Sequence, residues 1–265
     1  SVDPPLKACE GRVVQGVSRL GKRLVFDLGD DRYLVIHLMI AGRLRWGARK
    51  EGAKPMGKIA LAGFDFPNGS LTLTEASTKK RASIHVVQGA AALAAHDRGG
   101  LDVLSAPPEA FAQALRAENR TLKRALTHPA RFDGIGNAYS DEIFHAARLS
   151  PLRLTQSLSD DEVARLHQAT QTVLRTWTER LVERFAKKFP GPGDVTAFRP
   201  EFAAHGKYGE PCPDCGKPIQ RIRYAENETN YCAQCQNEGR LLADRSLSRL
   251  LKDDWPKTVE ELVGE

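Results

Sequence analysis

Cys212-Pro213-Asp214-Cys215 and Cys232-Ala233-Gln234-Cys235 are two Cys-x-x-Cys knuckles separated by sixteen residues. Each knuckle can present two thiolates to one ion, and the residues between them can fold as a short hairpin. Four thiolates satisfy the tetrahedral preference of Zn²⁺ and leave no coordination position open. We therefore expect Cys212, Cys215, Cys232 and Cys235 to hold a structural Zn²⁺ that takes no part in chemistry.

Other uses of the cysteines fit this pattern less well. Disulfides need an oxidising compartment, and no secretory segment is visible. A thioredoxin-like redox pair would use a single knuckle in a βα context. Cys9 stands apart from the knuckles and is expected to be a small apolar core residue. The cysteine usage fits a reducing cytoplasm, and no apolar stretch reaches the roughly 18 residues of a membrane-spanning helix.

Length and charge bound the class of protein. The 265 residues suffice for about two domains. The net charge of +6 and the pI of about 9.1 favour a polyanionic partner such as nucleic acid. A soluble basic protein without such a partner fits the charge equally well.

Residues 10 to 90 are expected to form an antiparallel β-sandwich or barrel. Short runs rich in Val, Ile, Leu and Phe are separated by turn signals such as Gly29-Asp30-Asp31, with no βαβ alternation. The expected strands are Arg12–Val17, Arg23–Leu28, Tyr33–Met39, Ile59–Phe66, Ser70–Thr74 and Ser83–Val87.

From Gly99 onward the apolar spacing becomes helical. We expect helices over Pro107–Thr127 and Asn137–Ala147, with Asn137 as the N-cap of the second. Ser159 and Glu162 form a capping box that opens a long amphipathic helix, and a further amphipathic stretch is expected at 241–251. The predicted architecture is α+β and multidomain, with a β-sandwich at 1–98, a helical domain at 99–200, a zinc ribbon at 201–237 and a tail at 238–265.

Three local motifs occur in order along the chain. They are Ser18-Arg19-Leu20-Gly21-Lys22-Arg23-Leu24 running into Ile36-His37-Leu38-Met39-Ile40-Ala41-Gly42-Arg43-Leu44, then Gly134-Ile135-Gly136-Asn137-Ala138-Tyr139-Ser140-Asp141-Glu142, and then the ribbon from Gly206 to Gln236. Together they resemble the bacterial formamidopyrimidine-DNA glycosylase/endonuclease VIII family over roughly residues 8 to 237. In that family the middle motif is the loop-to-helix turn of a helix–two-turn–helix element.

The resemblance implies a base-excision-repair enzyme that removes oxidised or ring-opened bases from double-stranded DNA and then cleaves the strand. In the family, an N-terminal proline amine attacks C1′ of a flipped nucleotide and forms a Schiff base, and a neighbouring glutamate assists with protons. The implied partner is DNA that contains damaged bases or abasic sites. A monomer in the cytoplasm, associated with the nucleoid, is expected.

Several residues match family positions that contact DNA. Lys22 matches a lysine implicated in β-elimination, with phosphate contact as a second role. Asn137 and Lys123 match phosphate-binding positions, and Tyr139 lies in the same turn, where backbone amides at a helix start attract anions. An ordinary N-cap asparagine and solvated surface lysines are the competing interpretation.

Two further sites on the β domain are expected to meet DNA. Ile40 stands where relatives place a methionine wedge that fills the gap left by the flipped base, although a buried strand residue is the alternative. Lys79, Lys80 and Arg81 form a cationic strip suited to phosphate contact, although a solvated charge run is equally compatible. His37 is expected to be a core histidine.

The sequence departs from the family pattern at two informative places. The Pro-Glu start is not seen, because Pro4 and Pro5 are internal and the chain begins at Ser1. We expect that a few dozen residues precede this sequence in the natural protein, with a shortened paralogue as the alternative. Asn227 replaces the phosphate-gripping arginine of the ribbon; Arg221 or Arg223 of the same hairpin is a candidate substitute.

Three functions are compatible with these observations. The leading one is a DNA glycosylase with AP-lyase activity, independent of metal in its chemistry. The second is a DNA- or lesion-binding paralogue of the same fold without catalysis. The third is a zinc-ribbon protein that binds RNA, against which the helix–two-turn–helix motif argues.

Overall fold

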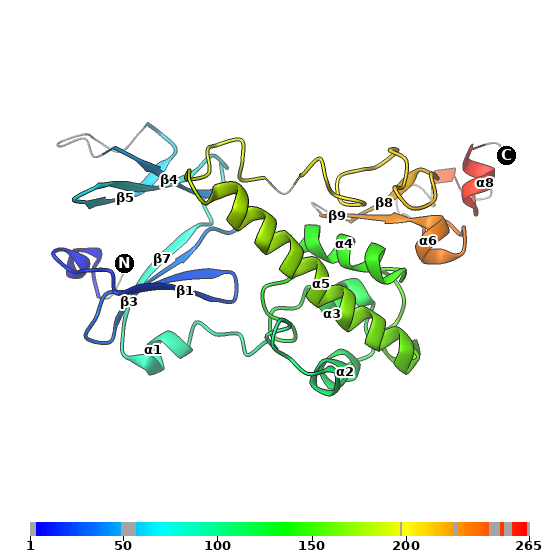
Figure 1. Ribbon diagram of the computed structural model, residues 1–265, viewed down its shortest axis with the longest axis horizontal. Coiled ribbons are helices and arrows are strands. Elements are labelled where there is room, and N and C mark those ends of the chain that lie inside the picture. Colours follow the sequence, from blue (N-terminus) through cyan, green and yellow to red (C-terminus); the bar gives the residue numbers. More distant parts are fainter. Residues whose placement is uncertain are drawn as a thin grey trace. The chain divides into compact units, whose positions relative to one another are not determined.

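The computed structural model describes residues 4–48, 57–196, 198–224, 227–243, 250–251 and 256–263. The chain divides into two compact units. The first comprises Ser1–Arg98 with Val182–Thr196, and the second comprises Gly99–Leu181 with Ala197–Glu265. Strands dominate the first unit and helices with a small hairpin the second (Figure 1), which confirms the predicted α+β class.

Two antiparallel sheets form the first unit. One has the order β1-β2-β3-β7 and the other β4-β6-β5. Ile36 of β3 and Leu73 of β6, both fully buried, belong to one apolar cluster, so the two sheets share a core as expected for a sandwich. The strands are β1 Gly16–Leu20, β2 Arg23–Asp27, β3 Arg32–His37, β4 Gly42–Gly47, β5 Ala60–Phe66, β6 Gly69–Glu75 and β7 Ser83–Gln88.

The predicted strands differ from the observed ones in two places. The first strand was expected at Arg12–Val17 but occupies Gly16–Leu20, because the tight turn at Gly21 pairs Leu20 with Arg23 and sets the register. Strand β4 was not predicted. Its Arg43 and Arg45 hide the apolar alternation, and its partner, β6, is distant in sequence.

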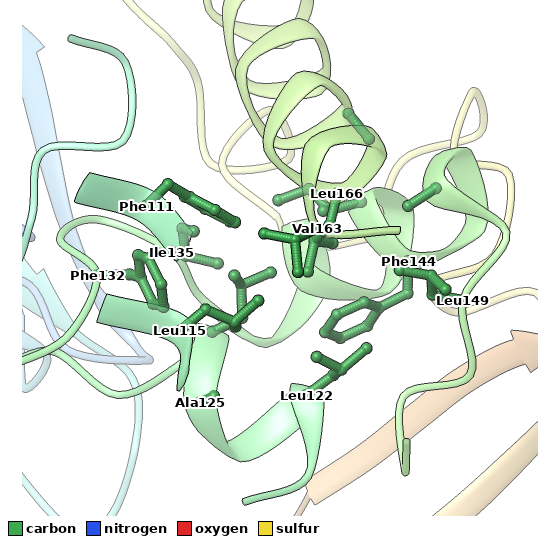
Figure 2. Packing of buried hydrophobic residues seen from close by; sticks show 14 of the residues in the cluster. Phe111, Leu115, Leu122, Ala125, Phe132, Ile135, Phe144, Leu149, Val163 and Leu166 are labelled. Atoms are coloured by element: carbon green, nitrogen blue, oxygen red, sulfur yellow. The ribbon is translucent and has the colours of Figure 1, made fainter. Parts of the chain in front are cut away.

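Four helices surround the apolar core of the second unit. They are α2 Pro108–Arg116, α3 Leu122–Leu126, α4 Asn137–Ala147 and α5 Asp160–Phe185, whose last residues belong to the first unit. Figure 2 shows Phe111, Leu122, Phe144 and Leu166 converging on this core from the four helices. Burying these side chains supplies the main stabilisation of the unit.

The helix predicted over 107–127 was wrong in its continuity, because it is interrupted between α2 and α3. There the backbone of Arg120 exchanges hydrogen bonds with Thr155, which accepts from the Arg120 N–H through Oγ1 and donates its own N–H to the Arg120 carbonyl. These long-range bonds replace the intrahelical ones. The capping box is confirmed: Ser159 N–H donates to Glu162 Oε2 at 2.9 Å, and Glu162 N–H donates to Ser159 Oγ at 3.2 Å.

The zinc ribbon consists of a hairpin and a short helix. They are β8 Ile219–Tyr224, β9 Asn227–Cys232 and α6 Ala233–Asn237. A short C-terminal helix, α8 Val259–Val263, follows in the tail (Figure 1). Tail residues pack on the hairpin, since Val259 is buried with Tyr231 and the Leu242 N–H donates to Tyr231 Oη at 2.7 Å. Most of the helix predicted over 241–251 lies outside the described residues.

Candidate nucleic-acid interface and zinc centre

The four knuckle cysteines meet at one point of the second unit. All four Sγ atoms lie within 4.8 Å of one another, and Cys212 Sγ is 3.9 Å from Cys235 Sγ while Cys215 Sγ is 3.4 Å from Cys232 Sγ. Tetrahedral Zn²⁺ with Zn–S bonds of about 2.3 Å requires sulfurs about 3.8 Å apart. The sulfur positions therefore fit Zn²⁺, and the predicted structural zinc site is confirmed.

Local backbone geometry shapes the second knuckle. The side chain of Cys232 caps α6, because its Sγ accepts the Cys235 N–H at 3.4 Å. The same sulfur atom is therefore both a zinc ligand and the cap of the helix. Burial raises the pKa of the Cys235 thiol to about 12 and also raises that of Cys232. Zn²⁺ must displace these protons, so its binding to the ribbon strengthens as pH rises.

Helix α4 is attached to the ribbon by buried carboxylates. Asp141, which is fully buried, accepts from His205 Nδ1 at 2.7 Å and from the N–H of Asn230 at 3.1 Å. Glu142 accepts the consecutive N–H groups of Ala203, Ala204 and His205 at 2.8–2.9 Å. The helix thus supplies the acceptors that a strand of the ribbon and the loop before it require.

The residues predicted to bind phosphate surround the start of this helix. Lys123 Nζ donates to Asp141 Oδ1 at 2.5 Å and to the Asn137 carbonyl at 3.0 Å. Burial lowers the pKa of Lys123, and the carboxylate of Asp141 opposes that shift. Asn137 Nδ2 donates to the Glu228 carbonyl at 2.8 Å. Helices α3 and α4 and strand β9 therefore meet at Asn137.

The expected N-cap role of Asn137 was wrong. Gly136 is the N-cap residue, no side chain caps the helix, and Asn137 is the first helical residue. Its amide points to the ribbon because Glu228 offers a carbonyl there. The first backbone N–H groups of α4 are consequently left without a side-chain acceptor, which suits a helix start that faces an anion.

Tyr139 belongs to an aromatic cluster of the second unit. Its ring centroid is 6.1 Å from that of Trp177 and 5.6 Å from that of Phe202, in edge-on geometry. Burial raises the pKa of Tyr139. These contacts give Tyr139 a packing role beside α5, and a DNA contact by this residue stays a prediction.

Two arginines of β8 lie on the same hairpin as the exposed ribbon residue Asn227. Arg221 stacks on the ring of Tyr208, with Cζ 4.0 Å from the ring centroid, and lies 3.8 Å from the Glu228 carboxylate. Arg223 Nε donates to the same carboxylate at 3.1 Å. Guanidinium groups are thus present on the hairpin whose strand β9 bonds Asn137.

In the first unit, Lys22 lies in the turn between β1 and β2. Its side chain is exposed. His37, at the end of β3, is half-buried, and burial together with the nearby charges of Arg23 and Lys22 lowers its pKa. The expected core role of His37 therefore holds only in part, since this histidine also faces a group of cations.

Ile40 lies in the turn before β4 and is 77% exposed, so the alternative of a buried strand residue was wrong. The preceding residue, Met39, has φ of 53° and is itself 42% exposed. Two adjacent exposed apolar side chains, one of them on a residue with left-handed backbone, are unusual on a surface that binds nothing.

The loop after β6 carries Lys79, Lys80 and Arg81, all exposed. The buried carboxylate of Glu75 shapes this loop by accepting the N–H groups of Arg81 and Ala82 at 2.9–3.1 Å. Lys80 Nζ donates to the Glu75 carbonyl, so one of the three cations of the strip is bonded within its own loop.

These features define a zinc-ribbon protein with a helix–two-turn–helix unit and a β-sandwich, and comparison with known proteins gives the same family for each part. The N-terminal domain of formamidopyrimidine-DNA glycosylase matches residues 3–85, its H2TH domain matches 102–182, and the zinc finger found in FPG and IleRS matches 209–237.

Individual relatives agree with these matches. A formamidopyrimidine-DNA glycosylase of Symbiobacterium thermophilum is 33% identical over 237 residues, which cover 86% of this chain and 74% of the relative. An uncharacterized formamidopyrimidine-DNA glycosylase-like protein of Mycobacterium tuberculosis is 36% identical over 153 residues, 58% of this chain and 94% of the relative. The Lactococcus lactis Fpg in complex with abasic-site DNA has a TM-score of 0.76 at 26% identity, covering 89% of this chain and 88% of that one. This chain belongs to the formamidopyrimidine-DNA glycosylase family.

Sequence reasoning missed the buried polar residues that assemble the site. Asp141 and Glu142 were expected only as acids of the first turn of the helix, which they are not, and Glu75 was not singled out, although each is buried and accepts two or more hydrogen bonds. The available signal was the four-residue spacing of Asn137, Asp141 and His145, which places three polar side chains on one face of α4. Among the described residues, no helix is long and apolar enough to cross a membrane.

Proposed function

We propose that this protein is a base-excision-repair DNA glycosylase that acts on oxidised or ring-opened bases in double-stranded DNA and cleaves the resulting abasic site as an AP lyase. Membership in the formamidopyrimidine-DNA glycosylase family supports the glycosylase assignment. The Lactococcus lactis Fpg of similar fold was solved with DNA containing an abasic site. We place the activity in the cytoplasm, at the bacterial nucleoid.

The observation that carries the proposal is the meeting of three elements at Asn137. Lys123 of α3 donates to the Asn137 carbonyl, and Asn137 Nδ2 donates to the carbonyl of Glu228 in the ribbon. The uncapped start of α4 lies at the same point. Backbone amides at a helix start and a nearby cation form a clamp that suits a phosphate of the DNA strand.

In the proposed reaction an N-terminal amine attacks C1′ of the flipped nucleotide, and the glycosidic bond breaks as the base leaves with a proton. The amine loses its proton, and its lone pair then forms the C=N⁺ bond of a cationic imine as the C1′–O4′ bond breaks, the sugar ring opens and O4′ takes up a proton. Removal of a C2′ proton then expels the 3′ phosphate, which is β-elimination. Lys22 contacts the sugar-phosphate during this step, Ile40 fills the space of the flipped base, and Lys79, Lys80 and Arg81 contact the backbone.

Borohydride trapping tests the lyase step. The full natural protein is incubated with a duplex that carries one abasic site, and borohydride reduces the imine to a stable covalent adduct. An adduct that appears on abasic DNA and not on undamaged DNA supports the lyase. Binding to abasic DNA without any adduct would leave the non-catalytic lesion-binding paralogue as the explanation.

Matched variants test the phosphate clamp. Asn137→Ala should weaken binding to abasic-site DNA up to about tenfold, because it removes the bond to the Glu228 carbonyl that holds the ribbon at the helix start, and such a bond contributes about 0.5–1.5 kcal/mol. The slope of affinity against salt should not change, since asparagine carries no charge. Asn119→Ala, at an exposed position near α2, is the control. Equal affinities of the two variants, measured by fluorescence anisotropy, would remove Asn137 from the interface.

A further inference from the structure

A buried histidine of α4 contacts a zinc ligand. Nε2 of His145 lies 3.3 Å from Sγ of Cys212, and the two residues are 5% and 2% exposed. His145 and Cys212 are 67 positions apart in the chain and come from different elements. The contact is therefore a direct side-chain contact made by tertiary packing.

The direction of this hydrogen bond follows from the metal. A zinc-bound cysteine is a thiolate, which has no proton to donate and can only accept. The ring of His145 must then carry its proton on Nε2 and donate it to the sulfur. His145 is not a fifth ligand, because the set of described ligand atoms that lie within 4.8 Å of one another consists of the four cysteine sulfurs alone.

The thiolates of the ribbon differ in how their charge is compensated. Cys232 Sγ accepts a backbone N–H of its own knuckle, from Cys235 at 3.4 Å. The Cys215 sulfur accepts the backbone N–H of Lys217, and because Cys215 is exposed, water can also solvate it. Cys212 is buried, and a buried anion requires a donor. The side-chain donor that the described residues bring to Cys212 is His145.

His145 also continues a polar stripe along α4. Asn137, Asp141 and His145 are spaced four residues apart, which places them on one face of the helix. Each of them bonds the segment between 205 and 232, through Glu228, through His205 with Asn230, and through Cys212. The stripe begins at the candidate phosphate site and ends at the metal.

We propose that His145 is a positioning residue of the zinc centre, which donates its Nε2–H to the Cys212 thiolate and thereby fastens the metal to helix α4. The proposal goes beyond the repair reaction and does not depend on it. Partners of metal ligands orient the ligand and slow its dissociation, and losing one commonly weakens metal binding by about 10- to 100-fold.

Two substitutions at this position separate packing from the hydrogen bond. His145→Phe keeps an aromatic ring and removes the donor, whereas His145→Gln keeps an N–H that can reach the sulfur. His167→Phe is the matched control, because His167 is equally buried in the same unit and bonds the Ala106 carbonyl at 3.0 Å, away from the ribbon.

The readout is the rate at which an excess of a coloured chelator removes Zn²⁺ from the folded protein. We expect His145→Phe to lose zinc about ten times faster than the unsubstituted chain. His145→Gln should release zinc at a rate close to that of the unsubstituted chain. His167→Phe should also release zinc at the original rate, even if it melts at a lower temperature. Zinc loss from His145→Phe at the original rate, or from His145→Gln as fast as from His145→Phe, would overturn the proposal.

A measurement on the unsubstituted chain covers the case in which the phenylalanine variant does not fold. With ¹¹³Cd²⁺ in place of zinc, a scalar coupling between the metal and the ring N–H of His145 should be detectable by NMR, since the Nε2 proton is hydrogen-bonded to a metal-bound sulfur. A sharp His145 N–H signal without coupling to cadmium would overturn the proposal.

Discussion

Asp141→Asn tests how strongly the buried carboxylate of α4 holds the second unit together. Asp141 accepts hydrogen bonds from Lys123 Nζ at 2.5 Å, His205 Nδ1 at 2.7 Å and the N–H of Asn230 at 3.1 Å, and its side chain is fully buried. Asparagine has the same shape but no charge, and it turns an NH₂ group toward one of the donors. The Lys123 ammonium, only 13% exposed, then loses its counter-charge.

The expected cost follows from this geometry. Removing one partner of a buried ion pair costs about 3–5 kcal/mol, because the other charge stays buried without compensation. For a unit of about 150 residues, 1 kcal/mol lowers the melting midpoint by about 2–4 °C. We therefore expect Asp141→Asn to lower the midpoint of the second unit by about 10 °C at pH 6.

The pH dependence provides a signature of the mechanism. Burial holds the pKa of Lys123 in the folded protein below its ordinary value of 10.5. At pH values between the lowered pKa and 10.5, the unfolded chain therefore binds more protons than the folded chain. The free energy of unfolding that this group contributes consequently rises with pH across that window. Without Asp141 the pKa of Lys123 falls further. The difference in melting midpoint between Asp141→Asn and the unsubstituted chain should consequently shrink as pH rises, once Lys123 is neutral in the folded variant.

Scanning calorimetry of the zinc-loaded protein between pH 6 and 9 measures both effects. Asp160→Asn is the control, because Asp160 also pairs with an arginine, Arg116 at 2.9 Å, but is 92% exposed. That control should keep the original midpoint. If Asp141→Asn melted with the control at every pH, the buried carboxylate would not be what attaches α4 to the ribbon.

Four further predictions concern the ribbon, the tail and the β domain. Cys232→Ser should unfold the ribbon and weaken DNA binding, and unchanged zinc content by atomic absorption would contradict the ligand assignment. Tyr231→Phe should cost about 1–2 kcal/mol, because the Leu242 N–H loses its acceptor, and it should expose the tail to protease. Burial raises the pKa of Tyr231 to about 12, so the unsubstituted chain should also lose stability above pH 10 as the unfolded tyrosine ionises; a flat profile would argue against this burial. Lys22→Ala should reduce the yield of borohydride-trapped adduct while Lys58→Ala, at another exposed position, should not, and equal yields would remove Lys22 from the reaction.

The match between sequence expectation and structure depended on how local each signal was. The bounds of α4, Asn137–Ala147, agreed with the prediction because a glycine-rich loop and a periodic apolar pattern define them locally. The capping box of Ser159 and Glu162 spans four residues and was equally readable. The break between α2 and α3 was not, because its cause is a bond to Thr155, 35 residues away.

The role of Asn137 shows the same limit in the candidate site. Asparagine before a helical pattern is a typical N-cap, and the sequence offered no reason to prefer another partner. The carbonyl that redirects its amide belongs to Glu228, 91 residues further along the chain. The 77% exposure of Ile40 likewise could not be predicted from the sequence, because it depends on the conformation of the turn before β4.

The amino-acid sequence by itself determined the metal site, the family and the order of the parts. The signals for them, namely knuckle spacing, turn motifs and apolar periodicity, each depend on residues that are close together in the chain. Only the tertiary structure decided which side chains join those parts. Asp141, Glu142 and His145 look like ordinary residues of one helix, and their partners at 203–205, 212 and 230 lie more than 60 positions away. A buried polar group takes its role from the donor or acceptor that packing brings to it, and that partner is a property of the fold.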